Sequence, residues 1–327
     1  MKTVQNITIT NILLQSGAVC KINLSFQTFG LPIGMAPIVL VNHALTGNSN
    51  VVGENGWWNN VVGENKVIDT KKHTVIAFNI PGNGYDNSVE NLIENYKIFT
   101  TKDIASIFWK GLEYLKISQL FAVIGGSLGG AIAWEMAFIK PNAIQNLIPV
   151  ATNWKANDWL IGNVLVQDAI LNNSKNPIHD ARLHAMLLYR TPQSLAVKFN
   201  SEKNNNQNNY KVESWLLHHG EKLTERFQLS AYKLMNHLLK TIGENSNEAD
   251  VLDFVKNSKT KIHQIAINTD YFFTPNENIK THNLLSNSTK NITYHEINSI
   301  HGHDAFLIEY ESLNNILQTI FNTKHNN

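Results

Sequence analysis

The chain has 327 residues, of which 43% are hydrophobic and 16% are charged. The hydrophobic residues suffice for a large core, and the charged residues are too few for a disordered chain. Because 27 Lys and Arg residues balance 26 Asp and Glu, the formal net charge is +1, and we expect no nucleic-acid or membrane partner. The single cysteine, Cys20, excludes an intramolecular disulfide framework and a cysteine-based zinc site. No apolar run spans a membrane and no signal peptide is recognised, so a soluble cytoplasmic protein is expected.

The first half of the chain alternates strand patterns with helical patterns. Residues 7–14 and 20–30 alternate apolar and polar side chains, as antiparallel strands with one solvated face do. We expect Thr100 or Thr101 to be the N-cap of one helix, and another helix to end before Pro141. Continuous apolar runs that end in polar or glycine residues are typical of buried parallel strands, and they occupy residues 37–47, 73–84, 120–130 and 146–153.

Helical patterns dominate from about residue 154 to residue 254. Strand patterns return afterwards at residues 261–270 and 291–299, and a final helix is expected over residues 304–321. The predicted helices of the helical block are residues 158–173, 179–199, 212–227 and 230–243, with a polar loop at 201–210.

This order of elements predicts an α/β fold with a mostly parallel sheet and helices on both faces. Residues 1–153 and 255–327 would form the core, and residues 154–254 would be a helical lid inserted over the carboxyl edge of the sheet. Open α/β sheets bind their ligands at that edge, so we expect the functional site beneath the lid.

The sharpest motif is Gly125-Gly126-Ser127-Leu128-Gly129-Gly130, which contains the Gly-x-Ser-x-Gly pattern of a nucleophile elbow. An apolar strand precedes it and a helix follows, which is the context that this tight turn requires. The turn would raise the Ser127 hydroxyl onto a helix N-terminus, where the helix dipole favours a developing negative charge. The alternatives are a phosphate-binding loop, although no P-loop lysine follows, and a plain strand–helix turn.

A serine nucleophile needs a base and an acid that orients the base. Asp270 and His303 follow in the expected chain order and lie where two predicted strands end, so both could reach Ser127 across the same edge. His301 competes with His303 for the role of base. A metal site formed by His301, His303 and Asp304 is a further alternative, and Asp270 could instead form an Asx turn.

Acyl transfer also requires two backbone N–H groups that stabilise the oxyanion of the tetrahedral intermediate. One is expected from Leu128, the residue after the nucleophile. The second is expected from the loop His43-Ala44-Leu45-Thr46-Gly47, which follows the first buried parallel strand, with Leu45 as the candidate donor. The alternative is that this loop only ends a strand.

Five segments together resemble the homoserine O-acetyltransferase family, whose members are α/β-hydrolase-fold acyltransferases of methionine biosynthesis. They are HALTG at 43–47, ENGWW at 54–58, the glycine-rich elbow, VESWLLHHGEKL at 212–223 and GHDAFL at 302–307. The resemblance extends from about residue 5 to residue 320. HALTG and GHDAFL are much more specific than the elbow alone.

The resemblance implies roles for individual residues. Ser127 would be the nucleophile, Asp270 the acid, and His303 the base in preference to His301, because it is the histidine of GHDAFL. Asp304 matches a residue that contacts the homoserine amine, and Tyr232 matches a tyrosine near the acceptor site. The family further implies acetyl-CoA and L-homoserine as substrates, no bound cofactor or metal, and a homodimer that pairs through the lid.

Two features depart from the family pattern. The insert after Asn79 is short, and Ser201 stands where the family places the arginine that pairs with the homoserine carboxylate. The residues that could replace this arginine are Arg182, Arg190, Lys198 and Lys203, although lysine lacks the planar bidentate grip of a guanidinium.

The resulting hypothesis is a ping-pong acetyltransferase that forms an acetyl-serine intermediate at Ser127. An esterase or thioesterase with the same triad, a homologue that uses succinyl-CoA, and a non-catalytic protein of the same fold are the alternatives.

Overall fold

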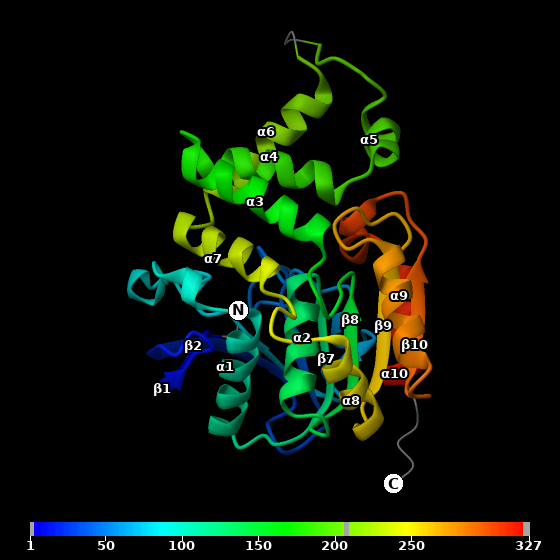
Figure 1. Ribbon diagram of the computed structural model, residues 1–327. Helices are drawn as coiled ribbons and strands as arrows, with labels where there is room; N and C mark the ends of the chain where they lie inside the picture. The colour runs from blue at the N-terminus through cyan, green and yellow to red at the C-terminus, as the bar shows by residue number, and fades with distance from the viewer. Residues whose placement is uncertain (1–2, 206–208, 323–327) are drawn as a thin grey trace.

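The computed structural model describes residues 3–205 and 209–322, and its centre is an eight-stranded sheet (Figure 1). The strand order is β1-β2-β6-β3-β7-β8-β9-β10, antiparallel between β1, β2 and β6 and parallel in the remaining pairs. The predicted mostly parallel sheet is therefore confirmed. The strands are β1 Gln5–Leu13, β2 Val19–Gly30, β3 Ile38–Asn42, β6 Thr74–Phe78, β7 Leu120–Gly126, β8 Ile144–Val150, β9 Lys261–Ile267 and β10 Ile292–Ile297, with a separate pair β4 Val62–Gly63 and β5 Ile68–Asp69.

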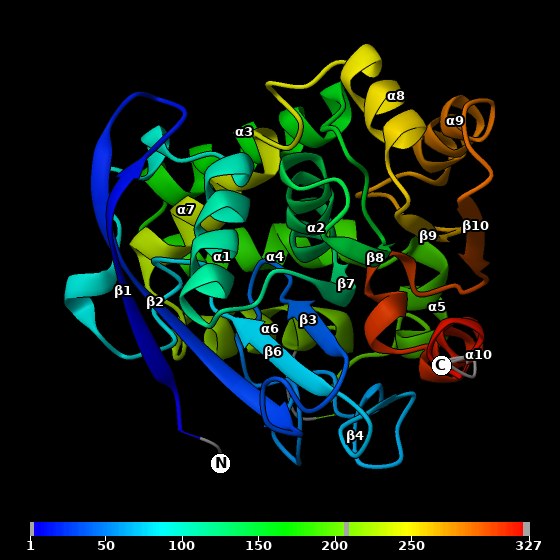
Figure 2. The same ribbon diagram turned by 90° about the horizontal axis from the view of Figure 1, so that it is seen from below.

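Helices cover both faces of the sheet because its strands bury side chains on both sides. In β7 all seven residues are buried, and Val123 belongs to one apolar cluster while Ala122 and Ile124 belong to the other. The helices of the first face are α1 Thr101–Tyr114, α2 Leu128–Ile139, α8 Glu248–Asn257 and α9 Pro275–Ser286. Helix α10 Tyr310–Phe321 covers the second face, as Figure 2 shows.

Local sequence signals set the ends of the two predicted core helices. Thr100 caps α1, since its hydroxyl accepts from the Asp103 N–H while the Asp103 carboxylate accepts from the Thr100 N–H. Helix α2 ends at Ile139, before Pro141, as predicted. Both helix ends depend on residues next to them in the chain, and tertiary packing did not shift them.

The lid lies above the carboxyl edge of the sheet (Figure 1). Its helices are α3 Asp158–Asn173, α4 Pro177–Tyr189, α5 Pro192–Phe199, α6 Lys211–Thr224 and α7 Leu229–Lys240. Helix α4 packs against α3 and α6, and α7 packs against α3. The indole N–H of Trp159 donates to the Tyr271 carbonyl, which ties α3 to the loop after β9.

Two predicted helices are each divided in two. The segment 179–199 breaks after Tyr189, because Pro192 begins α5 and the Thr191 hydroxyl caps it. The segment 304–321 consists of the short helix η3 Gly302–Leu307 and α10. Two further short helices, η1 Val89–Asn91 and η2 Tyr96–Ile98, lie in the connection before α1.

Helices α8 and α9 were not predicted from the sequence. The predicted boundary between lid and core, after residue 254, falls inside α8. Phe254 of α8 packs its ring 5.3 Å from that of Phe138 in α2, so α8 covers the core.

The predicted polar loop at 201–210 includes residues 206–208, which lie outside the described residues. Among the described residues, no helix is long and apolar enough to cross a membrane.

Candidate active site

Ser127 sits on a sharp turn between β7 and α2. Its backbone has φ 55° and ψ −125°, a combination that a non-glycine residue rarely adopts. Glycines make this turn possible, because a Cβ at Gly129 would lie 2.3 Å from the Asn42 carbonyl oxygen, and one at Gly125 would lie 2.4 Å from the backbone of Gly129. The strained serine and the close approach of β3, β7 and α2 are the features expected of a nucleophile elbow.

The structure brings Ser127, His303 and Asp270 together in a line of hydrogen bonds. His303 Nε2 lies 2.9 Å from Ser127 Oγ, and His303 Nδ1 lies 2.7 Å from Asp270 Oδ2. All three side chains are almost completely buried. The arrangement suits a serine nucleophile whose base is oriented by a carboxylate.

Asp270 makes both sets of contacts that the sequence suggested for it, one with the histidine and one within an Asx turn. While Oδ2 faces His303, Oδ1 accepts hydrogen bonds from the backbone N–H groups of Phe272 (2.7 Å) and Phe273 (2.9 Å), which forms the Asx turn. The turn fixes the carboxylate in one orientation. Both carboxylate oxygens therefore have partners while the charge stays buried.

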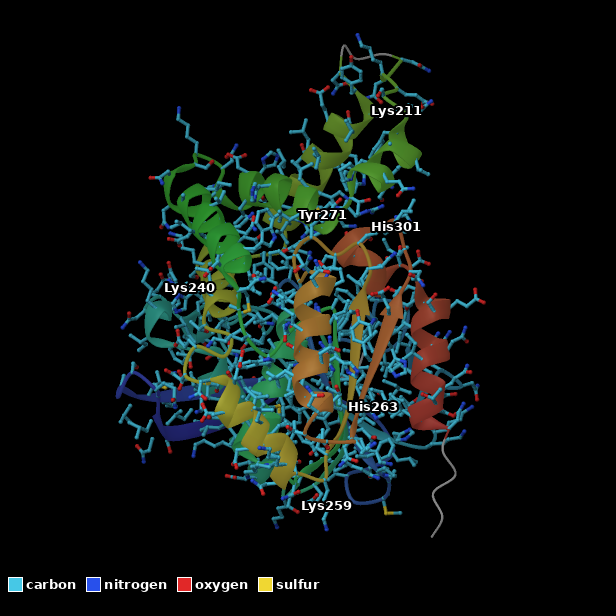
Figure 3. All side chains as sticks on the ribbon, turned by 45° about the vertical axis from the view of Figure 1, so that its right-hand side comes forward. Lys211, Lys240, Lys259, His263, Tyr271 and His301 are labelled. Atoms are coloured by element: carbon cyan, nitrogen blue, oxygen red, sulfur yellow. The ribbon has the colours of Figure 1, made fainter. Side chains whose placement is uncertain are left out.

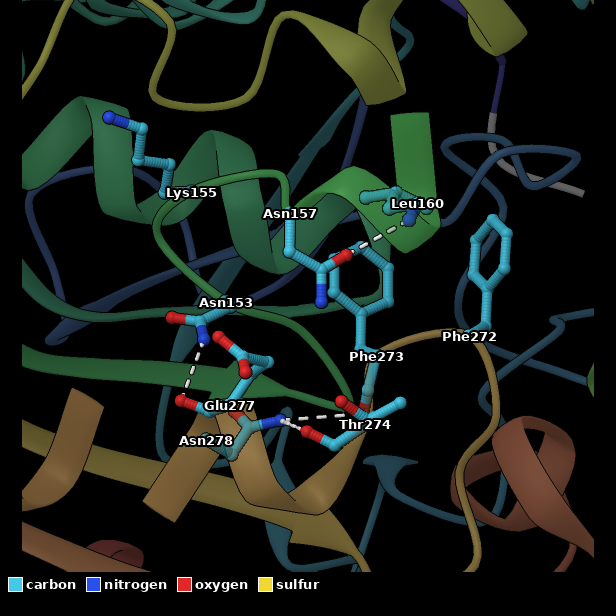
Figure 4. A pocket seen from close by; sticks show the side chains of 9 residues that line it. All are labelled: Asn153, Lys155, Asn157, Leu160, Phe272, Phe273, Thr274, Glu277 and Asn278. Carbon is cyan, nitrogen blue, oxygen red and sulfur yellow. Dashed lines mark hydrogen bonds between the residues drawn. The ribbon is translucent and has the colours of Figure 1, made fainter. Parts of the chain in front are cut away.

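A small cavity lies behind this turn, between the loop after β9 and the start of α3 (Figure 4). It has room for about one water molecule. The Asn157 side chain caps α3 there, and the Asn153 amide donates to the Glu277 carbonyl. The Asn278 amide, which also lines the cavity, donates to the Phe273 carbonyl at 3.4 Å. The cavity is too small to bind a substrate.

His301 is bound away from the nucleophile. Its Nδ1 accepts from the Arg190 guanidinium at 3.1 Å and from the Ser194 hydroxyl at 2.9 Å. Figure 3 shows His301 at the junction of core and lid. The geometry therefore favours His303 as the base, as the family resemblance implied.

Aromatic rings surround the imidazole of His303. The rings of Tyr189, Phe272, Phe273 and Phe306 have centroids between 5.2 and 5.7 Å from the imidazole centroid. This shell keeps water away from the hydrogen bond between His303 and the aspartate. Electrostatic interactions are stronger in such a medium than in water.

The loop of residues 43–47 lies against the first turn of α2, as predicted for an oxyanion hole. Asn42 pairs with Gly125 of the neighbouring strand, and the close approach of Gly129 involves the backbone of Asn42 and His43. Leu128 is the first residue of α2, a position whose N–H has no acceptor within the helix. Leu45 is buried in the same region.

A buried histidine anchors this loop, a role that the sequence analysis did not assign. His43 Nε2 accepts from the Ile80 N–H at 2.9 Å, and Nδ1 donates to the Ala44 carbonyl at 2.7 Å. Burial lowers the pKa of His43 to about 4, so the ring is neutral at physiological pH. The position of this histidine at the start of HALTG was the available signal.

Comparisons with known proteins agree with this geometry. Residues 37–296 match the alpha/beta hydrolase fold family. A homoserine O-acetyltransferase of Cyclobacterium marinum is 34% identical, with 92% of this chain and 90% of the relative covered. This chain belongs to the homoserine O-acetyltransferase family.

More distant proteins share the fold. A homoserine O-acetyltransferase of Methanococcus vannielii is 29% identical over 96% of this chain and 71% of its own length. A Bacillus anthracis homoserine O-acetyltransferase structure superposes with TM-score 0.85 at 18% identity, covering 98% of both chains. An esterase structure reaches TM-score 0.86 at 17% identity, covering 98% of this chain and all of the esterase. At such identities the likeness shows the fold alone.

The two residues that the resemblance assigned to the acceptor both lie near Tyr189, whose ring packs on His303. Tyr232 of α7 is buried, and with Leu45, Tyr189 and Phe272 it lines an enclosed cavity with room for about one water molecule. Burial raises the pKa of Tyr232 to about 12, so its hydroxyl stays protonated. Asp304 follows His303 in η3, and burial raises its pKa while the charges of Arg182 and Arg190 oppose that shift.

The four cations proposed to replace the missing arginine are dispersed. The Arg182 guanidinium lies 5.6 Å from the Tyr189 ring, which itself packs on His303, so Arg182 is next to the site. Arg190 is bound to Ser194 and His301. Lys198 lies near the Trp215 ring, and Lys203 near the Tyr210 ring.

Arg226 is a further cation at the site that the sequence analysis missed. Its Nη1 donates to the Thr46 carbonyl at 2.9 Å, within the predicted oxyanion loop. Its pKa is lowered, first by partial desolvation and then by the charge of Arg182, although part of the side chain is exposed. Ser201, in contrast, is exposed just beyond the end of α5. The signal for Arg226 was its place three residues after the end of the VESWLLHHGEKL segment.

Proposed function

We propose that this enzyme transfers an acetyl group from acetyl-CoA to the side-chain hydroxyl of L-homoserine, a step of methionine biosynthesis in the cytoplasm. The observation that carries the proposal is the buried line of hydrogen bonds from Ser127 through His303 to Asp270. Membership of the homoserine O-acetyltransferase family supports the choice of substrates.

In the first half-reaction His303 Nε2 takes the Ser127 proton as Oγ attacks the thioester carbonyl carbon. The resulting oxyanion accepts hydrogen bonds from the N–H groups of Leu128 and Leu45, each worth about 2.7–4 kcal/mol in the transition state. The carbon–sulfur bond breaks, and the His303 proton passes to the sulfur, which leaves as free CoA. Ser127 then carries the acetyl group as an ester.

In the second half-reaction the homoserine hydroxyl attacks the acetyl ester while His303 accepts its proton. The bond to Oγ breaks, the proton returns to Ser127, and O-acetylhomoserine leaves. Asp270 stabilises the imidazolium in both halves and holds the tautomer with hydrogen on Nδ1. The reaction needs no metal and no bound cofactor, because acetyl-CoA is a co-substrate.

Charges on both sides of the site suit an amino-acid acceptor. Arg226 and Arg182 would bind its carboxylate and Asp304 its amine, which their positions beside the Thr46 carbonyl, Tyr189 and His303 support. Tyr232, which lies beside Leu45, is the tyrosine that the family resemblance assigns to the acceptor site. This assignment replaces the arginine that Ser201 does not supply.

The test is CoA release from acetyl-CoA with and without L-homoserine. A transferase releases CoA much faster when the acceptor is present, and mass spectrometry then identifies O-acetylhomoserine. Equal release under both conditions would instead establish the esterase or thioesterase activity that the esterase fold neighbour suggests. The same assay with succinyl-CoA tests the acyl chain, and we expect the acetyl donor to be preferred.

We also propose that two copies pair through the lid. Helix α3 exposes four large apolar side chains, Trp159, Ile161, Leu165 and Val166, which a monomer would leave in water. Analytical ultracentrifugation should give a dimer for the native chain and a monomer for Leu165→Glu. A native monomer at micromolar concentration would contradict the proposal.

A further inference from the structure

A group of basic and aromatic side chains lies on the lid and borders the proposed acceptor site. Trp215, His219 and Lys222 occupy positions i, i+4 and i+7 of α6, a spacing that puts them on one face of the helix. Lys198 of α5 lies 5.6 Å from the Trp215 ring, and the Arg190 guanidinium lies 5.8 Å from it. We call these five residues the basic strip.

The basic strip concentrates positive charge without a neutralising carboxylate. Among the residues that the structure describes, no acidic side chain lies within ion-pair distance of Lys198, Lys222 or Arg190. The pKa of His219 is lowered to about 4, first by desolvation and then by surrounding cations that include Lys222 and Lys198. Like charges held together raise the free energy of the folded state unless an anion binds among them.

Acidic side chains of the same helix lie elsewhere. Glu221 and Glu225 line a separate groove with His179, between the start of α4 and the end of α6. Glu213 is engaged at the start of α6, where it accepts from the Tyr210 N–H. The acidic side chains of α6 therefore lie away from the basic strip and do not neutralise its charge.

The basic strip connects with the catalytic site at one end. Arg226, in the turn after α6, reaches the Thr46 carbonyl of the predicted oxyanion loop. Arg182 of α4 lies over Tyr189, which packs on His303. The far end of α6 is at Lys211, the outermost labelled residue of the lid in Figure 3. A ligand along α6 would thus have one end at Ser127 and the other at Trp215.

We propose that the basic strip binds the phosphorylated nucleotide of the acyl donor, with its phosphates on the exposed Lys198 and Lys222 and its adenine against Trp215. The proposal rests on the proposed function, since it takes the donor to be a coenzyme A thioester. A long pantetheine arm separates the thioester from the nucleotide in such a donor, so an anion site away from Ser127 is required. Lysine and arginine recognise phosphate, and aromatic rings stack on bases.

The experiment compares two donors in a double charge-reversal variant, Lys198→Glu with Lys222→Glu. Both side chains are exposed, so the variant should fold. We expect the KM for acetyl-CoA to rise roughly tenfold or more, with kcat at saturating donor unchanged. The KM for S-acetylpantetheine, which lacks the nucleotide, should not change. Lys175→Glu, an exposed lysine of the lid outside the strip, is the matched control.

A second measurement does not depend on catalysis. Isothermal titration of the native chain with adenosine 3′,5′-bisphosphate should show binding that weakens with added salt and is lost in the double variant. Trp215→Leu should weaken binding while leaving the salt dependence in place.

The outcomes separate the inference from the proposed function. If the double variant turns over acetyl-CoA normally and with the native KM, the proposal that the basic strip binds the nucleotide is wrong, and the proposed acetyl transfer is unaffected. If the native chain releases no CoA from acetyl-CoA, the proposed function fails, and the titration alone decides. Binding lost in the double variant then upholds the nucleotide site, and the absence of binding overturns it.

Discussion

The catalytic edge of the sheet and the lid above it differ in how their polar side chains are partnered. At the edge, Ser127, His303 and both oxygens of Asp270 are paired with one another or with backbone N–H groups. In the lid, Arg182 and Arg226 have no carboxylate within ion-pair distance among the described residues. The edge is complete before a substrate arrives, whereas the lid has charges that a substrate would neutralise.

This contrast separates the chemistry from the choice of substrate. Groups that stabilise a transition state act best when they are already fixed, because no reorganisation is needed at the moment of reaction. Groups that bind a charged substrate leave their charges free until it binds. Substitutions at the edge should therefore lower kcat, and substitutions in the lid should raise KM.

The largest effect is expected from Ser127→Ala at the centre of the edge. Without Oγ no acetyl ester forms, so turnover should fall at least about a thousandfold. Intact-mass spectrometry after mixing with acetyl-CoA should show one added acetyl group on the native chain and none on the variant. Acetylation of the variant would show that Ser127 is not the residue that carries the acetyl group.

Asp270→Asn should cost roughly 10²- to 10⁴-fold in kcat, because the amide no longer stabilises the imidazolium or its tautomer. Steady-state kinetics measure the loss, and the KM for homoserine should change little. Asp253→Asn, an exposed aspartate of α8, is the matched control and should behave as the native enzyme. A variant that kept full activity would show that the hydrogen bond to His303 has only a structural role.

Arg226→Ala tests the lid side of the contrast. Loss of a charged hydrogen-bond donor to the acceptor carboxylate should raise the KM for homoserine roughly ten- to hundredfold. The rate of acetyl-enzyme formation, measured by rapid-quench mass spectrometry, should stay near the native rate. Arg226→Lys should recover part of the affinity, while Lys175→Ala leaves it unchanged. If acetylation slows as much as transfer, Arg226 acts through the oxyanion loop and not on the acceptor.

The last prediction concerns stability and not turnover, at the contact between α2 of the core and the segment after α7 of the lid. Glu135 of α2 is buried, and its Oε1 accepts from the N–H of Gly243, just after α7. Desolvation raises its pKa to about 7. The stability that this protonated acid contributes is full below about pH 4.5 and is lost as the pH rises through 7.

Glu135→Gln should therefore gain stability over the native chain by up to about 3 kcal/mol between pH 5 and pH 8. Urea unfolding at the two pH values measures this difference, and Glu94→Gln, an exposed glutamate, should show none. A difference that is the same at both pH values would mean that Glu135 is ionised throughout.

The sequence supported some predictions more strongly than others. Buried strands and the cap at Thr100 depend on nearby residues and were predicted with only small shifts in their ends. The break at Pro192 had its signal in the sequence but was read as part of one long helix. Helices α8 and α9 were missed, and α9 has few buried residues to mark a helical face. Arg226 was missed because its approach to Thr46 joins residues far apart in the chain.

The sequence by itself determined the alternating α/β order, the glycines that allow the turn at Ser127, and the candidates for the triad, among which His301 and His303 competed for the place of the base. These depend on hydrophobic periodicity, on steric room at the backbone, and on motifs that are local in the chain. Only the tertiary structure decided that His301 binds Arg190 while His303 binds Ser127, and that Arg182 and Arg226, which have no carboxylate partner among the described residues, lie close to the site. Such choices depend on which distant segments pack together, because hydrogen bonds and charges act over a few ångströms in space whatever the separation along the chain.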